Sequence, residues 1–236
     1  MQGRVNPTGY RERPAPRGAG LACVWTSALP RAAAEPFVQR VVPDGCVDVY
    51  WSERDGRVFV AGPDTGPMPA LLLPGDRFVG VRFRPGTAGR VLTVPPAAVR
   101  DARVPLSDLW GADAERLEHS GDPGRALMAA LVARAASAPP PDPLVAGLIP
   151  ALATGSVARA ADDLGFSERQ IRRRTMDAFG YGPKTLQRVL RFQKALRLAR
   201  TGTPFADVTQ AAGYADQTHL AHEVRELGGA PLGTFR

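Results

Sequence analysis

The sequence contains few of the residues on which metal sites, disulfide frameworks and histidine catalysis depend. It has two cysteines, Cys23 and Cys46, and three histidines, the first of which is His119. The cysteines are too few for a disulfide framework and lack the Cys/His spacing of structural zinc. We therefore expect reduced thiols, no metal, no cofactor and no catalytic residue, and we predict that the protein is not an enzyme.

Long apolar runs are also missing. No stretch approaches the ~18–20 residues of a membrane helix, and the arginine-rich start of the chain lacks the apolar segment of a signal peptide. This predicts a cytoplasmic protein with no membrane partner. The 236 residues are 44% hydrophobic and 22% charged, which is typical of a soluble globular protein, and the length favours two domains.

Negative charge is scarce in one segment of the second half. The net charge is +7, which suggests an anionic partner. Residues 159–200 hold eleven Lys and Arg against four Asp and Glu, whereas residues 201–236 hold two against four. The positive excess is therefore concentrated in residues 159–200.

The first half of the chain has short β-rich runs separated by turn-forming residues. The runs cover residues 21–26, 37–42, 46–51, 58–61 and 78–84. Pro-Asp-Gly, Arg-Asp-Gly and Pro-Gly-Asp separate them, as tight turns between antiparallel strands require. This pattern predicts an antiparallel β-barrel or sandwich.

Helix-forming sequence follows from about residue 95, including Ala112–His119 and Pro123–Ala136. The proline-rich segment 139–143 cannot continue a helix. We therefore expect an α+β protein with three parts. They are a β-rich sensor or dimerisation domain (1–138), a linker (139–143) and an all-α domain (144–236).

The helical domain contains a pattern typical of a helix-turn-helix unit. Ser156–Leu164 predicts a short helix, Gly165 a left-handed turn, and Ser167 the N-cap of a second helix over 168–179. Arg169, Arg172 and Arg173 then share one outward face. Arginine suits bidentate contact with guanine, so this face is predicted to read DNA.

The same pattern recurs 45–50 residues later. A helix over 204–212 is followed by Gly213-Tyr214 and a second helix over 216–227, where Gln217, Thr218 and His222 are exposed polar positions. The intervening segment 184–200 has a broad apolar stripe and predicts one long helix. It would hold the two units at a fixed separation.

Residues from about 144 to 236 resemble the DNA-binding domain of the AraC/XylS family of transcription regulators. The matching motifs are Ala160-Ala161, Leu164–Ser167, Gly182-Pro183, Arg191 and Ala212–His219. The resemblance implies two helix-turn-helix units that enter successive major-groove segments of promoter DNA, with RNA polymerase as a second partner. Departures occur at His222, where the family usually has arginine, and at Val224-Arg225, where it usually has Phe-Lys.

By position, the resemblance assigns base reading to three arginines of the first unit and three polar residues of the second. Gln170 and Arg188 complete the predicted DNA-binding set, with Arg188 a candidate phosphate contact. The full set is Arg169, Gln170, Arg172, Arg173, Arg188, Gln217, Thr218 and His222.

The first half resembles a sensor-like domain that precedes AraC-type DNA-binding regions in actinobacterial-type proteins. The resemblance rests on segments such as 42–49, 61–65, 79–86 and 105–110. It implies a cupin-like barrel and a regulatory role in bacteria, and it identifies no ligand. The candidate ligand-binding residues are Cys23, Trp25, Cys46, Asp48 and Arg82.

Three roles remain open for the first half. It senses a small-molecule effector, it only forms a homodimer, or it is a thiol-based redox or alkylation sensor that uses Cys23 and Cys46. The cysteines also fit a role as buried, inert side chains. Asp48 lies between two valines, and a carboxylate inside a buried strand would need a partner.

Overall fold

The first half of the protein is built on an antiparallel sheet in the computed structural model, which describes residues 7–16 and 18–236. Six strands form this sheet, and two more form a separate antiparallel ribbon. In spatial order the six are β1 (Arg11–Pro14), β2 (Leu21–Ala28), β7 (Arg77–Phe83), β4 (Asp48–Ser52), β5 (Arg57–Ala61) and β8 (Arg103–Pro105). The ribbon pairs β3 (Phe37–Val41) with β6 (Met68–Leu72).

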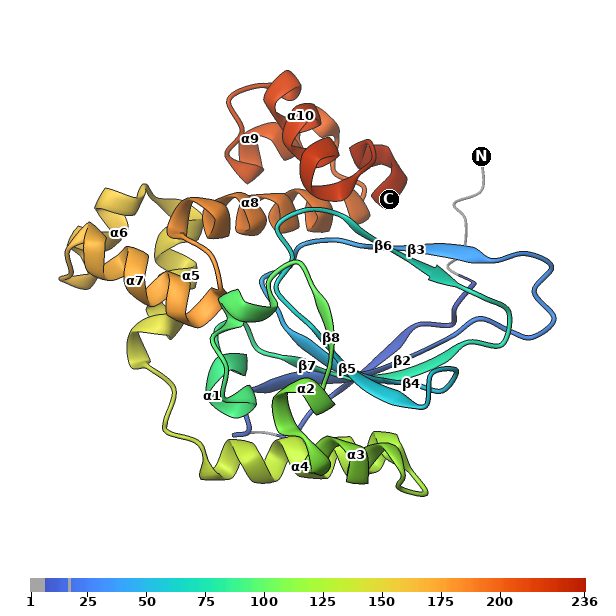
Figure 1. The fold of residues 1–236 in the computed structure, drawn as a ribbon. Helices are drawn as coiled ribbons and strands as arrows, with labels where there is room; N and C mark the ends of the chain where they lie inside the picture. The colour runs from blue at the N-terminus through green and yellow to red at the C-terminus, as the bar shows by residue number, and fades with distance from the viewer. Residues whose placement is uncertain (1–6, 17) are drawn as a thin grey trace.

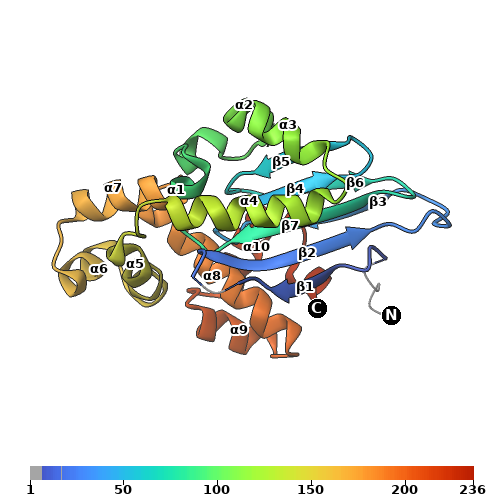
Figure 2. The same cartoon turned by 90° about the horizontal axis from the view of Figure 1, so that it is seen from below.

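Short helices cover one face of the six-stranded sheet. They are α1 (Ala88–Leu92), the 3₁₀ helix η1 (Pro96–Val99), α2 (Ser107–Trp110), α3 (Ala112–Glu118) and α4 (Pro123–Ser137). Figure 2 shows α4 lying along the sheet. Val49 and Val81 of the sheet and Leu127 and Leu131 of α4 are fully buried in one core. Each such side chain contributes roughly 1.5–3 kcal/mol by leaving water.

The second half is entirely helical. Its elements are α5 (Pro143–Thr154), α6 (Val157–Leu164), α7 (Glu168–Phe179), α8 (Pro183–Arg200), α9 (Phe205–Ala212), α10 (Gln217–Gly228) and the 3₁₀ helix η2 (Leu232–Phe235). Figure 1 shows α6 and α7 to one side of α8 and α9 and α10 above it. This arrangement confirms the α+β fold class with an antiparallel N-terminal part and two helix-turn-helix units joined by a long helix.

Local sequence fixes the ends of these helices. The Ser167 hydroxyl accepts from the Gln170 backbone N–H, and the Gln170 side chain accepts from the Ser167 N–H, which closes a capping box. Asp216 caps α10 through the His219 N–H. Gly165 and Gly213 end α6 and α9 at φ 71° and 82°, a left-handed conformation that favours glycine. The predicted caps and turns are confirmed, and each cap contributes about 1 kcal/mol.

Helix α8 belongs to two hydrophobic cores. Leu186 and Val189 from its first half are fully buried in the core of the first unit. Phe192 and Leu196 from its second half are fully buried in the core of the second. The two units are therefore packed on one continuous helix, as the apolar stripe predicted.

The two halves of the chain also contact each other directly. The Gln193 side chain donates to the Pro43 carbonyl oxygen at 2.6 Å, and Arg100 donates to the Gly180 carbonyl oxygen at 2.9 Å. At Gly86, a Cβ would lie 2.4 Å from Val145, so only glycine fits there without movement. These contacts join the sheet half to the helical half.

Three strands were not predicted from the sequence: β1, β6 and β8. In addition, β4 begins at Asp48, whereas the predicted run began at Cys46. Among the described residues, no helix is both long and apolar enough to span a membrane.

Candidate functional site

The outer face of α7 is a positively charged surface. Arg169, Arg172 and Arg173 are all exposed, while Ile171 and Phe179 on the inner side of the helix are buried. Within the part of the chain that the structure describes, none of these three arginines forms an ion pair. No carboxylate of the described residues therefore competes with a DNA base or phosphate for these three guanidinium groups.

Two neighbours of these arginines on α7, Gln170 and Arg174, form hydrogen bonds or ion pairs within the protein. Gln170 is exposed, but its amide oxygen accepts from the Ser167 N–H at 2.9 Å, which leaves the amide nitrogen available to a base. Arg174 pairs with Asp142 of the linker and lies near the Phe166 ring. Its guanidinium thus connects α7 to the linker.

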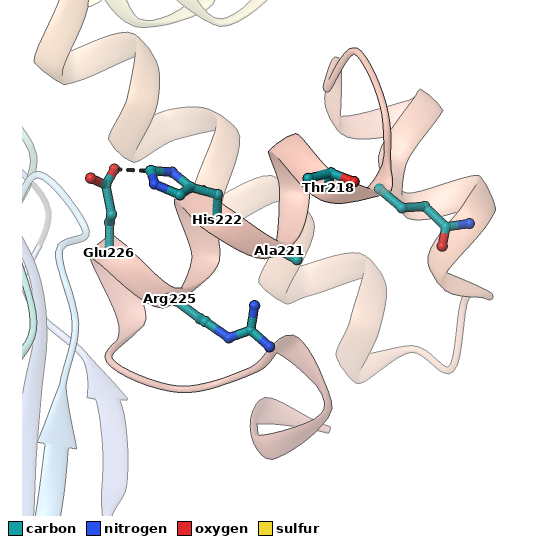
Figure 3. A pocket seen from close by; sticks show the side chains of 6 residues that line it. Thr218, Ala221, His222, Arg225 and Glu226 are labelled. Carbon is teal, nitrogen blue, oxygen red and sulfur yellow. Dashed lines mark ion pairs between the residues drawn. The ribbon is translucent and has the colours of Figure 1, made fainter.

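In the second unit, the exposed face of α10 lines a shallow hollow of about 680 Å³ (Figure 3). The predicted residues Gln217, Thr218 and His222 line it and are exposed. Three further residues line it that were not predicted from the sequence: Ala221, Arg225 and Glu226. Ala221 and Glu226 follow Gln217 and His222 by four residues, and Arg225 follows His222 by three, so helical spacing was the signal that could have found them.

Acidic side chains counter the basic ones around α10. Arg188 Nη2 lies 2.5 Å from Glu226 Oε2, and His222 Nδ1 lies 3.7 Å from the same oxygen. Figure 3 shows the His222–Glu226 pair. The predicted phosphate contact Arg188 is thus held by a carboxylate on the recognition face itself, in contrast to the unpaired arginines of α7.

A second carboxylate anchors α10 to α8. The Glu223 side chain is only 5% exposed, and its carboxylate lies 2.7 Å from Arg191 Nη2 and 3.4 Å from His219 Nε2. The His219 ring also packs edge-on against Tyr214. His219 is therefore largely occupied by packing within the unit, whereas His222 points outward.

The candidate ligand residues of the first half come together on the sheet face opposite α4. Cys23 and Asp48 are both direct cross-strand neighbours of Arg82, and Trp25 is the neighbour of Gly80. Arg82 donates to both carboxylate oxygens of Asp48 at 3.0 Å. Asp48 thus has the partner that its burial requires, and the strand pairing places four of the five predicted residues side by side.

The fifth residue, Cys46, lies in the preceding loop. Asp44 accepts from the Cys46 N–H at 2.8 Å and also lies 3.5 Å from Arg82, so this loop contacts the Arg82 cluster. The Asp44 bond is the turn chemistry that Pro-Asp-Gly predicted. Since Pro43 of the same loop accepts from Gln193, the loop links the sheet face to α8.

Burial governs the ionisation of this cluster. It raises the pKa of Cys23 to about 11 and the pKa of Cys46 well above its usual value. Burial also raises the pKa of Asp48, against the opposing effect of Arg82. Both thiols are therefore protonated near neutral pH, which makes them weak nucleophiles.

A row of aromatic rings extends from the cluster across the strands. The ring centroids of Tyr10 and Trp25 are 5.9 Å apart, those of Trp25 and Tyr50 are 6.0 Å apart, and those of Tyr50 and Phe59 are 5.6 Å apart. These separations are typical of interacting aromatic pairs. This face of the sheet therefore holds the Arg82–Asp48 ion pair beside a row of aromatic rings.

Two family models match separate segments of the chain. Residues 160–236 match the family model of a helix-turn-helix domain, and residues 19–105 match a domain of unknown function, DUF6597. No curated protein matches the sequence. The helical half is therefore a helix-turn-helix DNA-binding domain. It is of the AraC type, as its motifs indicated.

Solved structures of ToxT from Vibrio cholerae are similar in overall arrangement. An apo ToxT variant is 9% identical, with a TM-score of 0.48 over 95% of this chain and 100% of that one. Wild-type ToxT bound to an unsaturated fatty acid is also 9% identical, with a TM-score of 0.41 over 85% of this chain and 94% of that one.

Proposed function

We propose that the protein is a sequence-specific transcription regulator that binds promoter DNA through α7 and α10. The observation that carries this proposal is the packing of two helix-turn-helix units on one helix, α8, with Arg169, Arg172 and Arg173 exposed and unpaired on the first recognition helix. A single chain can then present two reading helices, so that DNA binding does not require a dimer. RNA polymerase is the proposed protein partner of the DNA-bound form.

We further propose that the domain over residues 1–138 controls the DNA-binding domain over residues 144–236 in response to a small molecule. Support comes from the loop at Pro43 and Asp44, which contacts both Arg82 and Gln193. A ligand on the sheet face would compete for the bonds between Arg82 and Asp48, and the change would reach α8 through this loop. The linker 139–143 then connects two domains, and the first domain acts on the second through the direct contact of this loop with α8.

DNA selection tests the regulator role. The full-length protein is incubated with a library of random duplexes, and bound sequences are enriched and read. We expect enrichment of one bipartite sequence that binds more tightly than a shuffled version of the same composition. If the enriched and shuffled duplexes bound equally at all salt concentrations, binding would be electrostatic only and the role as a sequence-specific regulator would be wrong.

Dimerisation alone is a second candidate role for the first half. Val38 and Leu71 are cross-strand neighbours on the β3–β6 ribbon and are 53% and 63% exposed, so the ribbon presents two adjacent apolar side chains to solvent. The proposed occupant of this surface is the same ribbon of a second copy. Analytical ultracentrifugation of the wild type and of Leu71→Lys tests this role by measuring the oligomeric state of each. A wild-type dimer that becomes a monomer in the variant would support the role, and any other result would contradict it.

A further inference from the structure

The loop that connects β5 to β6, residues 62–67, lies against the C-terminal ends of both recognition helices. At Gly180, which caps α7, a Cβ would lie 3.0 Å from Cγ of Pro63. At Gly229, which caps α10, a Cβ would lie 3.1 Å from Cβ of Pro67. Both glycines are left-handed, at φ 78° and 65°. One loop of the first half therefore meets the same structural position in each helix-turn-helix unit.

Two arginines of the first half donate to the same two caps. Arg100 Nη1 donates to the Gly180 carbonyl oxygen at 2.9 Å, and Arg40 Nη1 donates to the Gly229 carbonyl oxygen at 3.3 Å. Carbonyl groups at the end of a helix lack partners within it, and the negative end of the helix dipole favours a cation there. A guanidinium group of the first half therefore stabilises the C-terminal end of each recognition helix.

The 62–67 loop is itself held firmly by the residues around it. The Asp64 side chain is only 6% exposed and accepts from Arg103 at 2.8 and 2.7 Å. Asp101 accepts from the Thr65 N–H at 2.6 Å, and its own N–H donates to the Pro63 carbonyl oxygen at 3.2 Å. Movement of the loop would break a buried ion pair, which is strongly unfavourable. The loop is therefore a fixed support for whatever packs against it.

These contacts leave the DNA-reading faces open. Arg169, Arg172 and Arg173 lie in the first two turns of α7, and Gln217 and Thr218 begin α10. All five side chains are exposed. The loop and the two donating arginines meet the opposite ends of these helices. The contacts are therefore compatible with DNA binding, and they act on where the helices lie.

We propose that the 62–67 loop, together with Arg40 and Arg100, sets the spacing between α7 and α10 and thereby the spacing between the two half-sites that the protein accepts. Helix α8 supports both units from within, but each unit packs on a different part of it, and long helices bend. The loop supplies a second support. This inference rests on the proposed reading of DNA by both helices, and it gives the first half a part in DNA recognition.

The accepted half-site spacing is a geometric property of the protein. Two recognition helices at fixed positions fit half-sites at one separation, and one inserted base pair turns the second half-site by about a tenth of a turn around the DNA axis. A protein with firmly held helices rejects the altered duplex, whereas a protein with loosened helices adjusts to it. The affinity lost on insertion therefore measures how firmly the loop and its arginines hold the two helices.

The double variant Arg40→Met/Arg100→Met removes the donors to both caps. Methionine keeps an unbranched side chain, and both arginines are exposed, so the fold should be unaffected. The double variant Arg57→Met/Arg116→Met is the matched control. It removes two exposed arginines whose hydrogen bonds stay within the first half.

Distance measurement by pulsed electron spin resonance tests the support without DNA. Spin labels are attached to the full-length protein through p-acetylphenylalanine in place of Asp162 on α6 and Ala211 on α9, two exposed positions, so that the native cysteines are not used. We expect one narrow distance distribution in the wild type and in the control. The Arg40→Met/Arg100→Met variant should give a broader or shifted distribution.

A binding measurement then tests the consequence for DNA. The selected duplex is compared with versions that have one base pair inserted or removed between the two half-sites. The wild type and the control should lose about tenfold or more in affinity, because the second half-site loses its base contacts. The Arg40→Met/Arg100→Met variant should lose clearly less. Pro67→Gly, which removes the ring beside Gly229 and leaves both arginines in place, should change the result in the same direction.

Two results would overturn the proposal. One is a distance distribution that is the same in the Arg40→Met/Arg100→Met variant and the wild type, and the other is an equal loss of affinity in both on insertion of a base pair. Either result leaves sequence-specific DNA binding intact and so does not affect the regulator role. A protein that selects no bipartite sequence would instead overturn the regulator role, and the distance measurement would still decide whether the first half holds the two helices.

Discussion

Arg188 Nη2 and Glu226 Oε2 lie 2.5 Å apart, so a carboxylate on the second recognition helix holds a cation of the helix that joins the two units. His222 is within 3.7 Å of the same carboxylate. The exposed face of the second unit therefore carries a carboxylate, whereas that of the first carries three unpaired arginines. We infer that the first unit supplies most of the electrostatic affinity for DNA.

Glu226→Gln should strengthen DNA binding. The change removes a negative charge from the reading face and releases Arg188 for a phosphate, which should raise the affinity severalfold at low salt and steepen the log K against log [salt] slope by about one. Fluorescence anisotropy over a range of salt concentrations measures both. Asp108→Asn removes the same charge from an exposed position of α2 and should change neither. Unchanged affinity in Glu226→Gln would show that Arg188 does not contact phosphate.

Arg172→Ala should weaken specific binding by about 1–3 kcal/mol and relax the sequence preference at one position. The guanidinium is exposed and unpaired, so its loss leaves no buried charge behind and the fold should be unaffected. Binding to the selected duplex and to single-base variants of it measures the effect. Arg116→Ala on α3 is the matched control. A uniform loss across all duplexes would instead assign Arg172 to phosphate.

Gln193→Ala should loosen the contact between the two halves. It removes the hydrogen bond to the Pro43 carbonyl oxygen, which contributes about 0.5–1.5 kcal/mol. Hydrogen exchange measured by mass spectrometry should show faster exchange, by up to about tenfold, in peptides covering residues 43–47 and 180–186.

Gln187→Ala is the matched control for this experiment. Gln187 donates to the Leu152 and Gly155 carbonyl oxygens within the helical half. Its removal should speed exchange around residues 152–156 and leave residues 43–47 unchanged. Equal behaviour of the two variants would contradict a specific role for Gln193 between the halves.

Cys23 should react slowly with iodoacetamide in the folded protein. With its pKa at about 11 in place of 9.0, the thiolate fraction at pH 8 is about a hundredfold lower. Because the folded pKa is above the unfolded value, the stabilisation from the neutral thiol is complete below about pH 9 and is lost as pH rises through 11. Mass spectrometry of native and urea-unfolded samples measures the reaction rates. Fast native labelling would revive the thiol-sensor alternative.

The helical half could be predicted from sequence because its signals are local. Ser167 and Asp216 are caps, and Gly165 and Gly213 are left-handed turns, each of which acts within a few residues of its own position. The three missed strands lack such signals. Each of β1, β6 and β8 contains a proline, which removes a ladder donor and suggests a loop, and β1 and β8 are the edges where a sheet tolerates it.

Side-chain pairs distant in sequence could be predicted only in part. The burial of Asp48 implied a partner, but the register of β4 against β7 was needed to identify Arg82. Nothing in the sequence indicated that Glu226 would reach Arg188, which lies on a different helix.

Footprinting of the full-length protein on its selected duplex tests the central claim most directly. Two helix-turn-helix units on one rigid helix predict protection of two major-groove segments about one helical turn apart on the same face of the DNA, at both low and moderate salt. Protection of a single segment would contradict the account, because α10 would then be a packing element and only α7 would read the sequence.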